Sequence, residues 1–287
     1  MKILITGGQG FVGKRFKKVF QEKYEILNPG SKELDITDRN AIFNYFKEHK
    51  PDIVFHFAAI AETNFCNENK ELAEKINVEG AIYVGEACKE YGSKLVFAST
   101  EQVFNGNLEI GPYKEEHTGI PNTVYGQNKL DAEIKLKEIL NELWILRFTW
   151  IFGLPEYQLN TPAEILNSTI KSIIKDKKIE IASNEFRGMA YVYDIIKNLE
   201  KVFNLPYGTY HFGSENNLER YDVVRYIFSL LSTEEKFNNL VIKIPNKYGD
   251  RRDLRLDCSK IKKYGIEFSD TKDSIKTCLI DFGYIKE

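Results

Sequence analysis

Tyr125 and Lys129 are the two side chains of this sequence best placed to move a proton together. They are four residues apart, and residues at that spacing share one face of a helix. The residues that follow, 130–140, favour helix. A free tyrosine has a pKa of about 10, and a nearby ammonium lowers that pKa by favouring the phenolate. Thr100, at the end of the buried strand predicted by the apolar run 94–98, can hydrogen-bond the same substrate oxygen. This set predicts proton transfer at a carbonyl or an alcohol.

The tyrosine–lysine spacing is weak evidence by itself. With 16 tyrosines and 40 lysines and arginines in 287 residues, chance produces roughly two such pairs. Tyr193 and Lys197 form one of them. Only Tyr125 follows a strand that ends in two hydroxyl residues, and this context favours a catalytic tyrosine over an ordinary tyrosine on a helix surface.

A glycine-rich stretch lies between the apolar run 2–6 and a helical segment that extends to about Glu22. Its glycines, Gly7, Gly10 and Gly13, have the spacing Gly-xx-Gly-xx-Gly. Such glycines permit a tight turn and let backbone amides approach a pyrophosphate at the N-terminus of the helix. After a strand and before a helix, the motif favours a dinucleotide site over a turn that binds nothing.

The second predicted strand, 24–27, bears on which dinucleotide binds. A carboxylate near the end of this strand is typical of sites that bind the ribose hydroxyls of NAD. Residues 28–32 contain none, and Lys32 is among them. The sequence therefore favours tolerance of, or preference for, the 2'-phosphate of NADP, with a merely solvated Lys32 as the alternative.

Strands and helices alternate through the first half of the chain. Strands are predicted at 2–6, 24–27, 34–37, 52–58, 94–98 and 144–148, and helices from Phe11 to Glu22, at 38–49, at 68–91 with Gly92 as its stop, and after Tyr125. This alternation is typical of an α/β fold with a doubly wound parallel sheet. Beyond Gly153 the pattern changes to a smaller α+β cap, with helices near 162–176, 192–204 and 219–232 and strands near 178–182, 208–212 and 240–244. We expect a first domain at 1–153, completed by part of 185–204, and a discontinuous second domain at 154–287.

Composition excludes several classes of protein. The formal net charge of -2 argues against a nucleic-acid partner, which usually requires a basic surface. No apolar run is long enough to span a membrane, so no membrane partner is expected. The four cysteines form no close pair and no cluster with zinc spacing, which predicts free thiols in a cytoplasmic protein without a metal site.

Taken together, these motifs resemble the extended short-chain dehydrogenase/reductases, whose nucleotide domain is of the Rossmann type, and within them the dTDP-4-dehydrorhamnose reductase family. The resemblance covers nearly the whole chain. It rests on the stretches 6–13, 34–38, 56–59, 76–78, 97–106, 112–116, 124–130 and 146–153.

The resemblance implies a role for each site residue. Thr100 would orient a substrate carbonyl, Tyr125 would donate the proton, and Lys129 would bind the nicotinamide ribose and lower the tyrosine pKa. Asn77 would support the site, and as a buried polar group it needs partners. The residues expected to contact NADP(H) or NAD(H) are Gly7, Gly10, Phe11, Val12, Gly13, Asp35, Ile36, Ala58, Ala59, Ile60, Asn77 and Lys129.

Substrate residues are implied in the same way. Thr63, Asn64 and Trp150 fall where the family contacts the sugar, although Trp150 can also be a packing aromatic. Arg187 and Arg252, together with Arg251, are candidates for the diphosphate because guanidinium suits phosphate oxygens, with surface salt bridges as the alternative. The implied substrate is a nucleotide-linked sugar.

The implied reaction is NAD(P)H-dependent reduction of the 4-keto group of a nucleotide-linked deoxysugar. Dehydratases of the superfamily carry an Asp-Glu pair after the catalytic threonine, whereas this chain has Glu101 and Gln102, and an amide cannot act as a base. Two alternatives stay open: a nucleotide-sugar epimerase, and a non-catalytic regulatory subunit like the family's partner of methionine adenosyltransferase. The family's Pro-Thr pair is absent near 188–191, and 249–256 also departs from the pattern, so the sugar is open. A homodimer is open as well.

Overall fold

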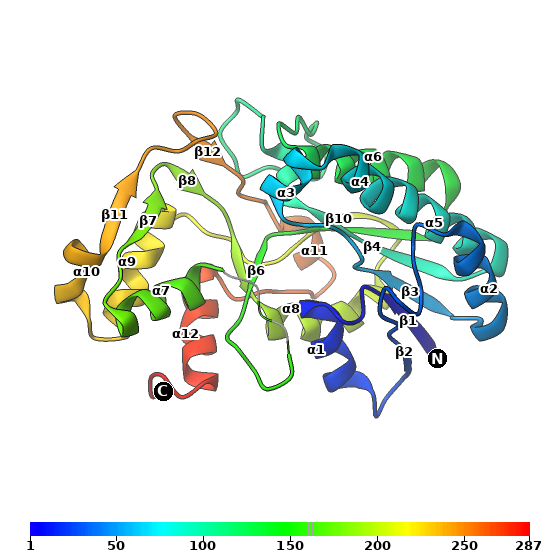
Figure 1. The fold of residues 1–287 in the computed structure, drawn as a ribbon, viewed down its shortest axis with the longest axis horizontal. Helices are drawn as coiled ribbons and strands as arrows, with labels where there is room; N and C mark the ends of the chain where they lie inside the picture. The colour runs from blue at the N-terminus through cyan, green and yellow to red at the C-terminus, as the bar shows by residue number, and fades with distance from the viewer. Residues whose placement is uncertain (160, 162–163) are drawn as a thin grey trace. The chain divides into compact units, whose positions relative to one another are not determined.

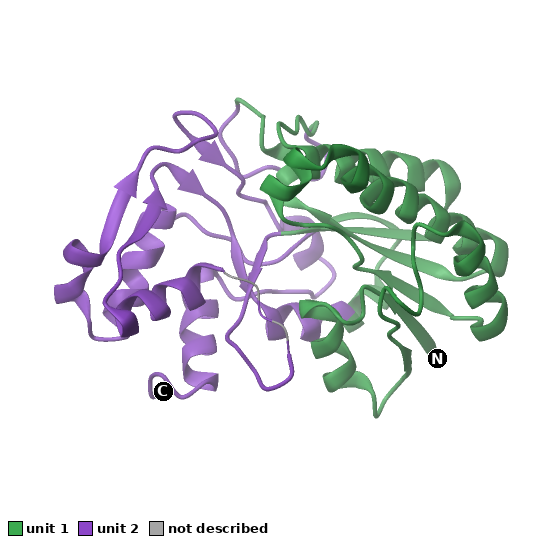
Figure 2. Cartoon of the chain, viewed as in Figure 1, with its two compact units in different colours: residues 1–108, 118–148, 200–210 green, residues 109–117, 149–199, 211–287 purple. Residues whose placement is uncertain are grey.

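The computed structural model describes residues 1–159, 161 and 164–287. The chain divides into two compact units (Figure 2). The first unit comprises residues 1–108, 118–148 and 200–210, and the second comprises residues 109–117, 149–199 and 211–287.

The first unit is built on a six-stranded sheet with the order β10-β5-β4-β3-β1-β2. The strands are β1 (Lys2–Thr6), β2 (Glu25–Leu27), β3 (Ile53–His56), β4 (Lys94–Thr100), β5 (Leu143–Phe148) and β10 (Gly208–Phe212). β1 pairs in parallel with β2 and β3, and β4 pairs in parallel with β3 and β5. The predicted α/β fold with a doubly wound parallel sheet is confirmed. The strand order reverses between β1 and β3, and in such sheets ligands bind at this switch point.

Helices connect the strands of this unit. They are α1 (Phe11–Phe20), α2 (Arg39–His49), α3 (Thr63–Glu68), α4 (Lys70–Glu74), α5 (Gly80–Tyr91) and α6 (Val124–Ile139), with the π-helical turn η1 (Lys75–Glu79) and the 3₁₀ turns η2 (Glu101–Phe104) and η3 (Glu200–Asn204). Figure 1 shows α1 on one side of the sheet and α5 and α6 on the other. The hydrophobic core on that second side joins Leu4, Val54 and Leu95 of the strands to Val84 of α5 and Leu136 of α6.

The strand predicted at 34–37 is wrong. The Asp35 carboxylate accepts hydrogen bonds from the backbone N–H and the hydroxyl of Thr37, both at 2.8 Å, and the Asp38 N–H donates to the Asp35 carbonyl. These local bonds favour a turn over an extended strand. The Asp38 side chain then accepts from the second and third residues of α2, which is the predicted N-cap.

The helix predicted at 68–91 is confirmed from Lys70 onward, because α4, the π-helical turn η1 and α5 follow one another without a break, whereas α3 was not predicted as a separate helix. Asn69 has φ -126° and ψ 58°, which interrupts the helix between α3 and α4. The π-helical turn η1 then joins α4 to α5. The predicted end is correct: Gly92 has φ 71°, a left-handed conformation that glycine adopts without strain.

The second unit consists of short parallel strand pairs and helices. β6 (Trp150–Phe152) pairs with β9 (Met189–Tyr191), β7 (Ile179–Ala182) with β11 (Val241–Ile244), and β8 (Glu185–Phe186) with β12 (Arg252–Asp253). The helices are α7 (Ile165–Lys175), α8 (Val192–Leu199), α9 (Arg220–Leu230), α10 (Glu234–Leu240), α11 (Ser259–Lys262) and α12 (Thr271–Asp281). The sequence predicted α7, α8, α9, β7 and β11 of this unit, as well as β10 of the six-stranded sheet, and it missed the other elements of the second unit. Residues 162 and 163, where the helix of 162–176 was expected to begin, lie outside the described residues.

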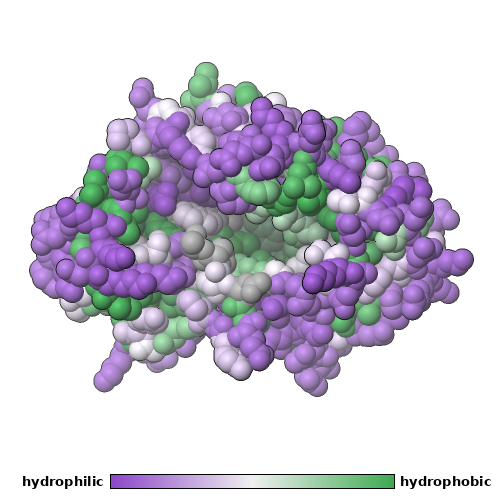
Figure 3. All heavy atoms as spheres, in the orientation of Figure 1, coloured by the Kyte–Doolittle hydropathy of each residue, from purple (hydrophilic) through white to green (hydrophobic). Residues whose placement is uncertain are grey.

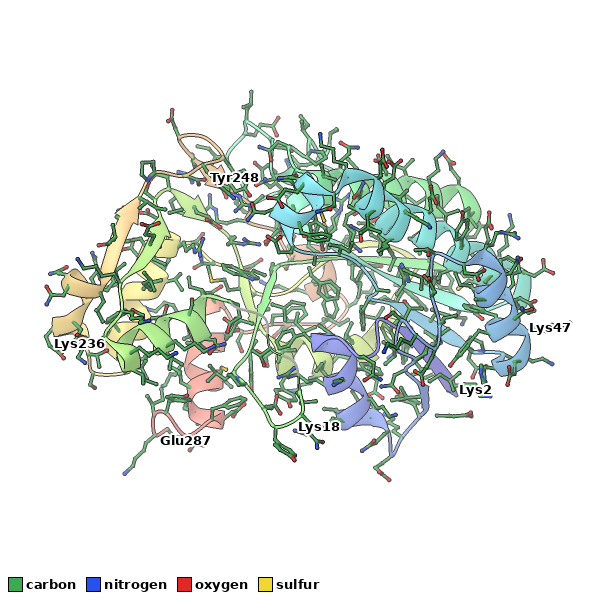
Figure 4. The ribbon with its side chains drawn as sticks, viewed as in Figure 1. Lys2, Lys18, Lys47, Lys236, Tyr248 and Glu287 are labelled. Carbon is green, nitrogen blue, oxygen red and sulfur yellow. The ribbon has the colours of Figure 1, made fainter. Side chains whose placement is uncertain are left out.

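Hydrophilic residues cover most of the face seen in Figure 3. Charged side chains such as Lys18, Lys47 and Glu287, labelled in Figure 4, are exposed. Among the described residues, no helix combines the length and the apolar character that crossing a bilayer requires.

Candidate active site

Lys129 is held against the sheet from the second turn of α6. The helix begins after Thr123, whose hydroxyl accepts a hydrogen bond from the Gly126 N–H and so caps it. Only 1% of the Lys129 side chain is exposed, and its Nζ donates to the Ala98 carbonyl oxygen of β4 at 2.8 Å. Burial lowers the pKa of Lys129 to about 8, while the negative charge of Glu133 opposes this shift. The ammonium therefore has one fixed partner and a protonation state that is sensitive to its surroundings.

Tyr125 is half-buried and precedes Lys129 by one turn of the same helix. Thr100, the last residue of β4, is buried, and its Oγ1 accepts a hydrogen bond from the Gln102 N–H at 3.2 Å. This bond occupies an acceptor position and leaves the hydroxyl proton of Thr100 able to donate to a ligand. Ala98, which holds Lys129, is two residues before Thr100, so one strand end positions both groups.

Thr63 and Asn64 begin α3, which Glu62 caps by accepting from the Asn64 and Phe65 N–H groups. The Thr63 hydroxyl donates to the Gln102 Oε1 at 3.4 Å, which links the start of α3 to the turn after Thr100. The Asn64 side chain is exposed. Of the two predicted sugar contacts in this unit, the structure brings Thr63 close to the catalytic set.

A pocket of about 380 Å³ lies at the switch point of the sheet. Seven of the predicted cofactor residues line it, namely Gly7, Gly10, Asp35, Ile36, Ala58, Ala59 and Ile60. The pocket does not include Phe11, Val12, Gly13, Asn77 or Lys129 among its lining residues. Phe11 and Val12 are half-buried and Gly13 is buried, all three in the first turn of α1. The walls come from the segments after β1, β2 and β3, which is where a doubly wound sheet binds a nucleotide.

At Gly7 and Gly13 the backbone of the glycine loop lies so close to neighbouring backbone that a side chain would not fit. Gly7 has φ 69°, and a Cβ at this position would be 2.7 Å from the backbone nitrogen of Ala58. A Cβ on Gly13 would be 2.7 Å from the Cα of Gly8. Gly10 immediately precedes α1, so the free N–H groups of that helix start at the pocket. A dinucleotide pyrophosphate fits this arrangement of amides and this absence of side chains.

Asn77 supports the pocket wall from η1. Its side chain accepts from the Ile60 N–H at 2.8 Å and donates to the Ile60 carbonyl oxygen at 3.0 Å. The Cys66 thiol donates to the same carbonyl oxygen at 3.3 Å. Asn77 therefore has the partners that a buried amide needs, and its contact with the pocket is indirect.

Sequence reasoning missed a carboxylate in the segment after β2. The Gly30 N–H donates to the Glu33 Oε2 at 2.7 Å, so this carboxylate folds back onto a pocket-lining residue. Lys32 is exposed, whereas Lys17 of α1 donates from its Nζ to the Asn28 Oδ1 at 2.9 Å. The missed signal was a carboxylate one residue beyond the stretch in which we expected it.

In the second unit, three arginines surround the buried carboxylate of Glu185. Nη1 atoms of Arg187, Arg220 and Arg252 lie 3.4, 3.1 and 3.2 Å from its oxygens. Burial alone would raise the pKa of Glu185, but the three guanidinium groups hold it below its usual value. Three guanidiniums around one carboxylate concentrate positive charge, which is an arrangement suited to an anion.

Aromatic rings flank this arginine cluster. The guanidinium carbons of Arg187 and Arg220 lie 4.5 and 5.2 Å from the Trp150 ring centroid. Arg252 lies 4.2 Å from the ring of Tyr248, which is labelled in Figure 4. Trp150, Arg187 and Arg252 were predicted from the sequence to bind substrate, whereas Arg220 and Glu185 were not. Arg251 is separate from Glu185 and pairs with Asp253 at 2.9 Å.

Known proteins resemble this chain over its full length. The family model of the RmlD substrate binding domain matches residues 1–283. The dTDP-4-dehydrorhamnose reductase of Aggregatibacter actinomycetemcomitans is 28% identical over 96% of this chain and 97% of its own length. The crystal structure of dTDP-4-dehydrorhamnose reductase from Bacillus anthracis in complex with NADP is 25% identical, with a TM-score of 0.84 over 98% of this chain and 99% of that one. The methionine adenosyltransferase 2 subunit beta of Pongo abelii is 22% identical over 92% of this chain and 83% of its own.

Proposed function

The chain belongs to the RmlD substrate binding domain family, and from this premise we propose that it is an oxidoreductase that reduces a keto group of a nucleotide-linked sugar with NAD(P)H. The observation that carries the proposal is the joint placement of Thr100, Tyr125 and Lys129. The Ala98 carbonyl fixes Lys129 beside the end of β4, where Thr100 is, and Tyr125 is one helical turn away.

The residues of the first unit would divide the work of the reaction. When bound, the reduced nicotinamide supplies the hydride that the carbonyl carbon accepts. Thr100 donates its hydroxyl hydrogen bond to the substrate oxygen and holds it in place. Tyr125 gives that oxygen its proton, and the Lys129 ammonium stabilises the resulting phenolate. The net change is the reduction of one C=O to one CH–OH.

We assign the dinucleotide to the first unit. The glycine loop and the pocket of about 380 Å³ support this assignment, as does the NADP bound to the Bacillus anthracis relative. The exposed Lys32 favours the 2'-phosphate of NADPH, whereas the carboxylate of Glu33 at Gly30 favours the ribose hydroxyls of NADH. We propose that NADPH is accepted. The ratio of KM values for the two cofactors tests this, and a strong preference for NADH would overturn it.

We assign the diphosphate of the substrate to the second unit, and we propose Thr63 and Asn64 of the first unit as sugar contacts. The cluster of arginines around Glu185 supports a diphosphate bound by Arg187, Arg252 and Arg220, and Trp150 supplies an apolar ring for the sugar. A 4-keto-6-deoxy sugar is the class that the reductase relatives suggest. The expected boundaries, 1–153 with part of 185–204 and 154–287, differ from the two compact units of the structure, and we propose that these units are the two domains.

A cofactor-binding regulatory subunit is the second candidate, because the similarity to methionine adenosyltransferase 2 subunit beta covers 92% of this chain. NADPH and NADH oxidation should be followed by their absorbance with a panel of nucleotide-linked 4-keto-6-deoxy sugars. Stoichiometric oxidation with one sugar is the expected result. Interconversion of sugars without net cofactor consumption would instead identify an epimerase, and cofactor binding without any turnover would favour the regulatory subunit.

A further inference from the structure

Glu133 and Arg147 form a buried ion pair, and Glu133 is one helical turn beyond Lys129. Glu133, one turn further along α6, is fully buried, and Arg147 of β5 is 4% exposed. Arg147 donates from Nε to one carboxylate oxygen of Glu133 at 2.9 Å and from Nη2 to the other at 2.7 Å. This two-point bond fixes the orientation of the carboxylate as well as its position.

The sheet register explains why these groups meet. Ser99 of β4 and Arg147 of β5 are partners in the parallel pairing, so their side chains emerge side by side. The Ser99 hydroxyl donates to the same Glu133 oxygen that receives the Arg147 Nε. Side chains from β4 and β5 therefore hold the Glu133 carboxylate of α6, one helical turn from Lys129.

Two other titratable groups near Lys129 carry no charge near neutral pH. Burial lowers the pKa of His56 to about 3 and raises the pKa of the Cys66 thiol, so both are neutral near neutral pH. Glu101 is a buried carboxylate on η2, which packs on α6, and Tyr125 is on α6 itself. The acidic and basic residues of α4 and η1, which also pack on α6, are exposed, and solvent screens them.

We propose that Glu133 and Arg147 are positioning residues for the reaction proposed above: Glu133 keeps Lys129 charged beside Tyr125, and Arg147 holds Glu133 in place. Burial alone drives Lys129 towards the neutral amine, and Glu133 is the largest influence acting against it. If Glu133 lost its charge, the buried Arg147 would remain as a second cation and would disfavour the ammonium further. The inference rests on the proposed function, because it concerns the same lysine.

The test is the pH profile of kcat/KM for Glu133→Gln. We expect the decline of activity on the alkaline side to begin about one pH unit or more lower than in the wild type, with activity largely recovered at acidic pH, where Lys129 is again protonated. The double variant Glu133→Gln/Arg147→Met removes both charges of the pair, avoids a buried unpaired guanidinium, and should show a shift in the same direction. Glu138→Gln is the matched control, since Glu138 is on the same helix and pairs with Lys135 at the exposed surface.

A uniform loss of activity at every pH, without a shifted profile, would overturn the proposal. It would mean that the Glu133–Arg147 pair only stabilises the fold. A second readout separates this outcome from failure of the proposed function itself. The phenolate absorbance of Tyr125, taken as the difference between each protein and its Tyr125→Phe form, can be titrated without any substrate. Glu133→Gln should raise the pKa of Tyr125, and an unchanged pKa would overturn the inference even if no reductase activity were found.

Discussion

The side chain of Asn77 forms two hydrogen bonds with the backbone of Ile60: it accepts from the Ile60 N–H at 2.8 Å and donates to the Ile60 carbonyl oxygen at 3.0 Å. An amide side chain can pair with both groups of one residue in this way because it carries an acceptor and a donor. Asn77 is in the π-helical turn between α4 and α5, and such turns are frequent at functional sites. The contact fixes the chain after β3, which forms one wall of the pocket.

Replacing Asn77 with alanine should loosen this wall. Two backbone groups of Ile60 would lose a partner, which we expect to destabilise the fold by about 1–3 kcal/mol and to raise the Kd of the dinucleotide. Chemical denaturation and fluorescence titration with NADPH measure the two effects. Asn69→Ala is the control: the Asn69 amide donates to the Phe65 carbonyl at an exposed site, and its loss should change stability by less than about 0.5 kcal/mol. Equal effects of the two substitutions would refute the role of Asn77.

The sequence was sufficient for the parallel sheet and for the helix that carries Tyr125 and Lys129, because both depend on local patterns. Apolar runs identified β1, β3, β4 and β5, and helix spacing placed Tyr125 and Lys129 on one face. The strand expected at 34–37 failed for a reason that hydrophobic pattern does not encode: Asp35 bonds its own neighbour, Thr37, and the sheet ends at β2.

Partners distant in sequence were the part that the pattern could not reveal. Glu185 and Arg252 are 67 residues apart, and only the pairing of β8 with β12 brings them together. The Glu133–Arg147 pair likewise depends on how α6 crosses β4 and β5. A carboxylate surrounded by arginines gives no periodic signal, so such clusters appear only in three dimensions.

Two glycines with the same backbone conformation should respond differently to alanine. Gly7 and Gly92 have φ 69° and 71°, so each substitution strains the backbone by about 1 kcal/mol. A Cβ on Gly7 would also collide with the backbone of Ala58, whereas a Cβ on Gly92 would meet nothing within 4 Å. Gly7→Ala should therefore abolish measurable dinucleotide binding, while Gly92→Ala should lower the Tm by a few degrees and leave the Kd unchanged. Comparable Kd values in both variants would show that the close approach of Gly7 to Ala58 is not required.

Tyr125→Phe should lower kcat by a factor of about 100 or more and leave the Kd for the dinucleotide within about twofold. The phenyl ring retains the packing and removes only the hydroxyl that donates the proton. Single-turnover kinetics and cofactor titration measure the two quantities. Tyr193→Phe is the matched control, because Tyr193 has the same spacing to Lys197 but donates its hydroxyl to Glu156 at 2.7 Å. Near-normal turnover of Tyr125→Phe would eliminate this tyrosine as the acid.

His56 should make the protein sensitive to acid. It is fully buried in β3, its Nδ1 lies 2.7 Å from the Thr6 hydroxyl, and burial together with the charge of Lys129 lowers its pKa from 6.5 to about 3. Between these two values the unfolded chain binds a proton at this histidine and the folded chain does not. Stability therefore decreases as the pH falls through this window, by at most about 1.4 kcal/mol per pH unit from this group.

Replacing His56 with glutamine removes the titrating group, so the free energy of unfolding should become less dependent on pH between about 6.5 and 3, although the variant loses some stability at neutral pH. Urea denaturation at a series of pH values gives both curves. The exposed His117, replaced in the same way, serves as the control. Parallel curves for wild type and His56→Gln would mean that the folded protein accepts the proton at His56. In that case neither burial nor the positive charge of Lys129 would disfavour the charged ring.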